Sequence, residues 1–260
     1  MIGVFDSGLG GLSILAAIAR VLPRADLCYL ADTAHVPYGN KPEEFIRGRV
    51  LAIGQHLVHR GCRLLVVACN TATAAAVINL RHQLPQVSVV GIEPGVKPAA
   101  AASPGKCIAV LATEATARSE RLQRLIRDHA PGVRVLVEAC PGWATRVETL
   151  HLDGPEFVAE ARQRLEPLLA AGADRIVLGC THYSFLAPTL AGIAGHQARL
   201  VDVAEAVAGQ VLRLAGAAEG NGHLELLATS QPERLHAALP RLGLHALAER
   251  ARAPAQLARV

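Results

Sequence analysis

Short aliphatic runs alternate along this chain with longer stretches that have the apolar spacing of helices. A strand that is apolar along its whole length is typical of a parallel sheet with helices on both faces. The alternation therefore predicts an α/β fold with mostly parallel sheets. The predicted strands are Ile2–Phe5, Leu27–Ala31, Leu64–Ala68, Val87–Ile92, Ile108–Leu111, Val133–Ala139, Ile176–Gly179, Leu200–Asp202 and Leu224–Leu227. The predicted helices are Leu12–Val21, Pro42–His59, Thr73–Leu84, Thr116–Asp128, Gly154–Ala171 and Ala204–Ala215.

The order of these segments repeats. Residues 2–7 resemble residues 108–113, and each segment is followed at a similar distance by a strand that ends in cysteine. Cys69 follows the first segment by 62 residues, and Cys180 follows the second by 67. We therefore expect two pseudo-symmetric α/β domains, with an active site in the cleft between them.

Two places in the sequence predict domain boundaries. The segment Glu93–Gly105 is rich in Pro, Gly and Ala, and we expect it to be a hinge. A second crossing is expected at Asp202–Glu205, so that the C-terminal segment completes the first half. The expected domains are residues 1–93 with 205–260, and residues 94–204.

Composition restricts the classes of function. Hydrophobic residues make up 51% of the chain and aromatic residues only 3%, so we expect a large aliphatic core. The net charge of +4 comes from scattered arginines without a basic run, which argues against a nucleic-acid partner. No apolar run approaches the ~20 residues that a membrane span needs, and no signal peptide is visible. We expect a small-molecule substrate and no membrane partner.

The six cysteines match neither a disulfide framework nor a metal site. None occurs as Cys-x-x-Cys, and no His/Cys spacing resembles a zinc site, so we expect no metal. Several lie inside apolar strand-like runs, which favours a reducing cytoplasm. A buried cysteine is usually an inert small hydrophobic residue, and we interpret Cys28, Cys62 and Cys107 in this way.

Cys69 and Cys180 differ from these three. Each ends a strand, precedes a hydroxyl-rich segment at the start of a helix, and occupies the equivalent place in the repeat. Ligands bind at the carboxyl ends of parallel strands, and a helix N-terminus stabilises a thiolate. We therefore predict that the two thiols form an acid/base pair. His182 lies two residues after Cys180, close enough to tune that thiol.

Two thiols are compatible with more than one chemistry. Nucleophilic catalysis needs one thiol and a base, and redox chemistry predicts a reversible Cys69–Cys180 disulfide. A racemase needs two groups, a thiolate that removes a proton from one face and a thiol that supplies one to the other. The three lysines, Lys41, Lys97 and Lys106, lie outside any Schiff-base context, so we expect no pyridoxal cofactor.

The loop Asp6–Gly11 follows the first strand and contains three glycines. Backbone N–H groups in such a loop can bind an anion at the start of a helix. The dinucleotide pattern G-x-G-x-x-G fails here, because Ser13 stands at the third glycine position. The alternative interpretation is a tight turn in which Asp6 or Ser7 caps the following helix.

Seven segments and the tail form an ordered set. They are GVFDSGLGGLSIL (3–15), VPYGNKP (36–42), VVACNTATA (66–74), ATEATARS (112–119), ACP with a glutamate eight residues after its cysteine (139–148), LGCTHYSFL (178–186), VDVAEAVA (201–208) and the tail LELLATSQPERLHAAL (224–239). In this order and spacing, the set resembles the cofactor-independent glutamate racemases of the aspartate/glutamate racemase superfamily.

The resemblance implies interconversion of L- and D-glutamate by two-base proton transfer, without pyridoxal phosphate, metal or nucleotide. It implies that Cys69 and Cys180 are the bases. Asp6 would assist Cys69, while His182 and Glu148 would assist Cys180. The implied substrate-binding residues are Asp6, Ser7, Pro37, Tyr38, Gly39, Asn70, Thr71, Thr113, Thr116, Thr181 and His182. A homodimer that supplies D-glutamate for peptidoglycan synthesis is also implied.

The chain departs from the family pattern at two places. Ser184 stands where the family often has proline, and residues 142–146 replace a more aliphatic stretch before Glu148. The second departure lies directly before Glu148 and therefore affects where its carboxylate is placed. Two other functions stay open: a racemase for aspartate or a related acid, and a nonenzymatic module that binds acidic metabolites and has the cysteines in its core.

Overall fold

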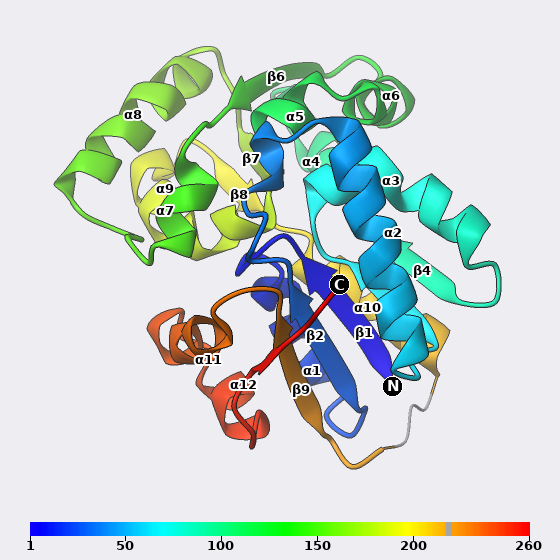
Figure 1. Cartoon of the computed structure of the whole chain (residues 1–260). Coiled ribbons are helices and arrows are strands. Elements are labelled where there is room, and N and C mark those ends of the chain that lie inside the picture. The colour runs from blue at the N-terminus through cyan, green and yellow to red at the C-terminus, as the bar shows by residue number, and fades with distance from the viewer. Residues whose placement is uncertain (217–219) are drawn as a thin grey trace. The chain divides into compact units, whose positions relative to one another are not determined.

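The computed structural model describes residues 1–216 and 220–260 (Figure 1). These residues divide into two compact units, Met1–Ile92 with Ala204–Val260, and Glu93–Val203. The boundaries expected from the sequence lie one residue further along the chain. The C-terminal segment thus belongs to the first unit.

The first unit contains a six-stranded sheet in the order β10-β9-β2-β1-β3-β4. Every pairing in it is parallel, and β9, near the C-terminus, pairs with β2 (Figure 1). Its strands are β1 (Ile2–Asp6), β2 (Leu27–Ala31), β3 (Leu64–Val67), β4 (Ser88–Gly91), β9 (Leu224–Ala228) and β10 (Gln256–Leu257). Its helices are α1 (Leu12–Val21), η1 (Tyr38–Asn40), α2 (Glu43–His59), α3 (Asn70–Gln83), α10 (Ala204–Ala215), α11 (Pro232–Arg241) and α12 (His245–Arg250).

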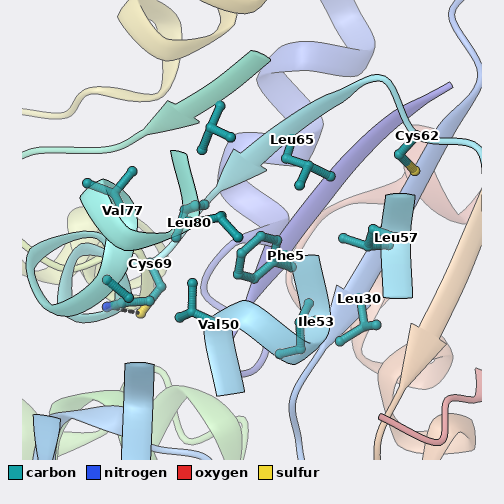
Figure 2. Close-up of a cluster of buried hydrophobic side chains, with 14 of the residues drawn as sticks. Phe5, Leu30, Val50, Ile53, Leu57, Cys62, Leu65, Cys69, Val77 and Leu80 are labelled. Carbon is teal, nitrogen blue, oxygen red and sulfur yellow. Dashed lines mark hydrogen bonds between the residues drawn. The ribbon is translucent and has the colours of Figure 1, made fainter. Parts of the chain in front are cut away.

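An aliphatic core joins α2 and α3 to this sheet. Figure 2 shows Phe5 of β1 among Val50 and Ile53 of α2 and Leu80 of α3. All four are buried almost completely. Burial of such a side chain contributes about 1.5–3 kcal/mol, so this cluster fixes both helices and the strand ends beside them.

The second unit contains a four-stranded parallel sheet in the order β6-β5-β7-β8. Its strands are β5 (Cys107–Ala112), β6 (Arg134–Ala139), β7 (Arg175–Leu178) and β8 (Arg199–Val201). Its helices are α4 (Val96–Ala102), α5 (Glu114–Arg118), α6 (Glu120–His129), α7 (Trp143–Glu148), α8 (Pro155–Ala170), η2 (Thr181–Leu186) and α9 (Ala187–Ala194).

The two sheets share one strand order over four strands. The order β2-β1-β3-β4 in the first unit corresponds to β6-β5-β7-β8 in the second. The prediction of two α/β halves with parallel sheets is therefore confirmed, and each of the nine predicted strands is present to within one residue at either end. Strand β10 was not predicted.

The structure differs from the expected local structure at two places, although the boundary between the units does fall at the start of the expected hinge. The expected hinge at Glu93–Gly105 contains the helix α4, and Val96, Ala99 and Ala100 of that helix are buried in the core of the second unit. Alanine is the strongest helix former, so its abundance indicated a helix rather than a linker. The single helix expected at Thr116–Asp128 is broken at Ser119, whose hydroxyl caps α6 by accepting from the Leu122 N–H.

Within the described residues, no helix has both the length and the apolar character needed to cross a membrane. The same residues contain no cluster of three or more His, Cys, Asp or Glu side chains that could hold a metal ion.

Candidate functional site

In the first unit, Asp6 and Cys69 lie at the same edge of the sheet. β1 ends at Asp6 and pairs with β3, which ends two residues before Cys69. Because the strands are parallel, their carboxyl ends share an edge, and this is the edge where α/β proteins bind ligands. Both side chains are buried, at 1% and 6% exposure.

The loop after β1 is organised by the Asp6 carboxylate. Its Oδ1 accepts a hydrogen bond from the Ser7 hydroxyl and another from the Gly8 N–H, each 3.0 Å long. A Cβ on Gly11 would come within 2.7 Å of the Asp6 Cβ, so only glycine lets α1 begin this close. Gly11 is the N-cap of α1 and no side chain bonds to the cap, so the alternative of Asp6 or Ser7 as the cap was wrong.

Cys69 is the N-cap residue of α3. Its backbone is extended, and its Sγ accepts a hydrogen bond from the Ala72 N–H at 3.5 Å, drawn as a dashed line in Figure 2. A thiolate in this position is stabilised by the helix N-terminus as well as by the N–H donor. The predicted position of Cys69 at a helix start is confirmed.

Asn70 and Thr71 open α3 and are both buried. Among the described residues, neither Oδ1 nor Nδ2 of Asn70 has a hydrogen-bond partner. A buried polar group without a partner costs about 1–3 kcal/mol, which a ligand with matching donors and acceptors would recover. Next along α3, Thr73 donates to the Val67 carbonyl and accepts from the Ile92 N–H, which ties the helix start to the ends of β3 and β4.

The predicted segment Pro37–Gly39 begins after a cis Val36–Pro37 peptide bond and continues into η1. The Tyr38 phenol is buried and donates to Asp32 Oδ2 at 2.6 Å. Burial and the nearby charges of Asp32 and Cys69 raise the pKa of Tyr38 far above its ordinary value, so the phenol stays protonated. Tyr38 thus lies within electrostatic reach of Cys69.

Asp32, which the sequence analysis did not single out, lies beside the predicted site residue Tyr38. It is fully buried and accepts from Arg49 Nε and Nη2, both at 2.9 Å, from the Thr229 hydroxyl and from Tyr38. His35 Nδ1 lies 3.0 Å from the same carboxylate. Burial opposes its charge, but these hydrogen bonds, led by that of Arg49, bring the pKa of Asp32 below its ordinary value. An aspartate directly after the second strand was the available signal.

In the second unit, three predicted residues form a chain of contacts. Cys180 follows β7, and its Sγ lies 3.6 Å from Nδ1 of His182 in η2. His182 Nε2 lies 2.5 Å from Glu148 Oε1 at the end of α7. Burial by itself lowers the pKa of His182, but hydrogen bonds to Cys180 and Glu148 and the charges of those groups raise it well above its ordinary value. The imidazolium form is therefore favoured beside the Cys180 sulfur.

Two threonines lie at the same edge of this sheet, because β5 pairs with β7. Thr113 follows β5 and is the N-cap of α5, where its hydroxyl accepts from the Thr116 N–H at 3.2 Å and donates to the Thr116 hydroxyl at 3.1 Å. Thr181, after Cys180, is also buried. Threonine hydroxyls next to a thiol supply donors and acceptors for a polar ligand.

Each unit therefore gathers its own set of predicted residues. The first unit holds Asp6, Ser7, Pro37, Tyr38, Gly39, Cys69, Asn70 and Thr71, and the second holds Thr113, Thr116, Glu148, Cys180, Thr181 and His182.

The other four cysteines are also buried, but they lie outside these two sets of residues. All six thiols are free. A hydrogen bond with Cys62, together with burial, raises the pKa of Cys28, and burial raises that of Cys140. Neutral thiols are poor nucleophiles and poor bases, so Cys28 and Cys140 resemble core residues.

Comparison with known proteins shows the family of this chain. The sequence profile described as Asp/Glu/Hydantoin racemase matches residues 3–211. The chain is 48% identical to the glutamate racemase of Methylococcus capsulatus, over 82% of this chain and 78% of that protein. It is 45% identical to the glutamate racemase of Pseudomonas aeruginosa, over 95% of this chain and 89% of that protein.

A solved structure gives the same result. Escherichia coli glutamate racemase, in complex with L-glutamate and the activator UDP-MurNAc-ala, matches with a TM-score of 0.84 and 31% identity. The match covers 93% of this chain and 94% of that one. From its profile, its relatives and its fold, this chain belongs to the Asp/Glu/hydantoin racemase family.

Proposed function

We propose that this chain interconverts L- and D-glutamate by proton transfer at Cα, with Cys69 and Cys180 as the two bases and no cofactor. The observation that carries the choice of substrate is the high identity to relatives named glutamate racemase over most of the chain. Family membership makes the chain an isomerase. The two-thiol mechanism is supported by two cysteines in equivalent positions of two similar units.

The reaction needs one thiolate and one thiol. The thiolate removes the Cα proton from one face and becomes a thiol, and the other thiol delivers its proton to the opposite face and becomes a thiolate. The product has the inverted configuration, and the two cysteines have exchanged protonation states. The Cα proton is far less acidic than a thiol, so hydrogen-bond donors must stabilise the charge that develops on the carboxylate side of the carbanion.

The residues beside each thiol fit assisting roles. Asp6 assists Cys69 at the shared edge of the first sheet. His182, held by Glu148, assists Cys180, because an imidazolium stabilises a neighbouring thiolate.

The remaining predicted residues are proposed to bind the substrate. Asn70 is the strongest candidate, because its buried amide can both donate and accept. The others proposed are Ser7, Pro37, Tyr38, Gly39, Thr71, Thr113, Thr116 and Thr181.

The cellular setting belongs to the same proposal. We propose a cytoplasmic homodimer that supplies D-glutamate for peptidoglycan synthesis. Analytical ultracentrifugation of the purified chain tests the dimer, and rescue of a D-glutamate auxotroph by the intact gene tests the supply of D-glutamate.

The primary test is proton NMR of L-glutamate and, separately, D-glutamate with the purified protein in D2O, without added cofactor, alongside a chiral assay. We expect loss of the Cα proton signal and formation of the opposite enantiomer from both starting forms. Exchange with aspartate but not glutamate would indicate a racemase for another acid.

Thiol chemistry separates the enzyme from the two remaining alternatives. We expect at least one of Cys69 and Cys180 to alkylate readily near neutral pH and to be protected by glutamate. Slow alkylation of both, with no Cα exchange of any acidic amino acid, would favour a nonenzymatic binding module. A reversible Cys69–Cys180 disulfide would favour redox chemistry.

A further inference from the structure

The only tryptophan in the sequence, Trp143, is completely buried in the second unit. It is the first residue of α7, a helix that begins after Gly142 in the left-handed conformation and ends at Glu148. It also lies in the stretch that departs from the family pattern.

Three contacts fix the indole. Its Nε1 donates to Glu160 Oε1 of α8 at 2.9 Å. Its ring packs edge-on against Phe157 of α8, with centroids 5.4 Å apart, and against Tyr183 of η2, with centroids 5.3 Å apart. Edge-to-face pairs add about 0.5–1.5 kcal/mol beyond the area they bury, so the side chain has little freedom to move.

Helix α7 and η2 also meet at the other end of α7. Glu148 of α7 contacts His182 of η2, the residue directly before Tyr183. The Tyr183 hydroxyl in turn donates to the Cys140 carbonyl, just before α7, at 3.1 Å. Helix α7 is thus attached to η2 at both ends, by Trp143 on Tyr183 and by Glu148 on His182.

We propose that Trp143 is a positioning residue that fixes α7 against η2, so that Glu148 stays against His182 and Cys180 stays reactive. The inference rests on the proposed function, in which Cys180 is one of the two bases. Trp143 is not one of the proposed bases, and we expect its effect on Cys180 to pass through the contact between Glu148 and His182. That restriction distinguishes the role from a general contribution to the core.

The restriction defines the experiment. Alkylation of Cys180 and Cys69 by iodoacetamide is followed peptide by peptide with mass spectrometry, across a pH series, in the intact chain. The variants are Trp143→Leu, Trp143→Phe, Glu148→Gln and the double variant Trp143→Leu/Glu148→Gln. The control is Leu122→Ala, which removes a buried side chain from another core cluster of the same unit.

We expect Trp143→Leu to slow alkylation of Cys180 near neutral pH about tenfold. This corresponds to a displacement of the alkylation rate profile by about one pH unit toward higher pH. Cys69 provides the internal reference and keeps its rate. Trp143→Phe keeps a ring but loses the bond to Glu160, so its effect is smaller. The double variant is no slower than Glu148→Gln alone, and Leu122→Ala leaves the Cys180 profile unchanged.

The proposal is overturned if Cys180 keeps its wild-type alkylation profile in Trp143→Leu, or if alkylation of Cys69 slows equally. It is also overturned if the two substitutions slow Cys180 in the double variant by the product of their separate effects. If far-ultraviolet circular dichroism and urea unfolding show that Trp143→Leu does not fold, Trp143→Phe and its double variant with Glu148→Gln decide the question by the same criteria. The alkylation result does not depend on racemisation. Failure of the proposed function shows instead as absence of Cα exchange in the wild-type chain.

Discussion

Cys69 and Cys180 occupy equivalent positions but have different chemical neighbours. Each follows the third strand of a matching four-strand order, and each begins a helical segment. Cys69 is a cap of a long α-helix and accepts from a backbone N–H. Cys180 has no such cap bond, and its partner is His182. The shared backbone fixes where a thiol stands, and the flanking side chains decide how its charge is stabilised.

A second pair of equivalent positions shows the same rule. Asp32 follows β2 and donates its N–H to the Asp6 carbonyl, while Cys140 follows β6 and donates its N–H to the Ala112 carbonyl. Asp32 is a buried charge with Arg49 as its partner, and Cys140 is a buried neutral thiol. Matching backbones therefore carry a polar network in one unit and an apolar packing residue in the other.

Replacing either strand-end thiol is expected to have the largest effect. Cys69→Ala and Cys180→Ala should each lower the rate of racemisation at least about a thousandfold, because each removes a proton-transfer group. The chiral assay measures the rate, and circular dichroism verifies the fold. Cys107→Ala is the matched control, since it removes a buried strand cysteine outside the site. Substantial racemisation by either site variant would mean that the two thiols are not an obligatory pair.

Asp32→Asn tests the comparison with Cys140. Loss of the charge opposite Arg49 should lower the free energy of unfolding by about 3 kcal/mol at neutral pH. The folded-state pKa of Asp32 is depressed, so its contribution is present above its unfolded value of about 3.8 and is lost as pH falls through the folded value.

The difference between wild type and Asp32→Asn should therefore shrink in acid, as measured by urea unfolding over a pH series. Cys140→Ala should cost less and show no such dependence on pH. An equal cost at both positions would show that the Asp32 network does not stabilise the first unit.

His182→Gln tests the difference between the two thiols. We expect kcat to fall about a hundredfold, since His182 assists one of the two proton transfers. Because the pKa of His182 is raised, the imidazolium persists at pH values above the ordinary histidine pKa. Its stabilisation of the Cys180 thiolate is lost as pH rises through the raised pKa. Alkylation of Cys180 near neutral pH should slow while that of Cys69 stays the same. Equal slowing of both thiols would contradict separate stabilisation.

Asn70→Ala is expected to have the smallest effect. KM for glutamate should rise about tenfold, because loss of one hydrogen bond to the substrate weakens binding by about 1.4 kcal/mol. Thermal stability should stay the same or rise, because the amide has no partner among the described residues and alanine favours the helix start. Steady-state kinetics and calorimetry measure the two quantities. A large loss of stability would indicate a structural role for the amide.

Much of the fold was accessible from the sequence, because strands and their ends are local features. The apolar runs predicted nine strands, and the repeat predicted two similar units. The break at Ser119 was missed because the spacing of apolar residues continues across it, while a single hydroxyl caps the new helix. Helix α4 was missed because proline and glycine around it indicate a linker.

The sequence by itself determined which residues end the strands, and hence that Cys69 and Cys180 lie at the carboxyl edges of two parallel sheets. Only the tertiary structure decided which distant side chains contact the residues around these thiols. Glu148 reaches His182 from 34 residues away, and Thr229 reaches Asp32 from 197 residues away. Strand ends follow from short-range periodicity, whereas a hydrogen bond between distant residues exists only once packing has brought their elements together.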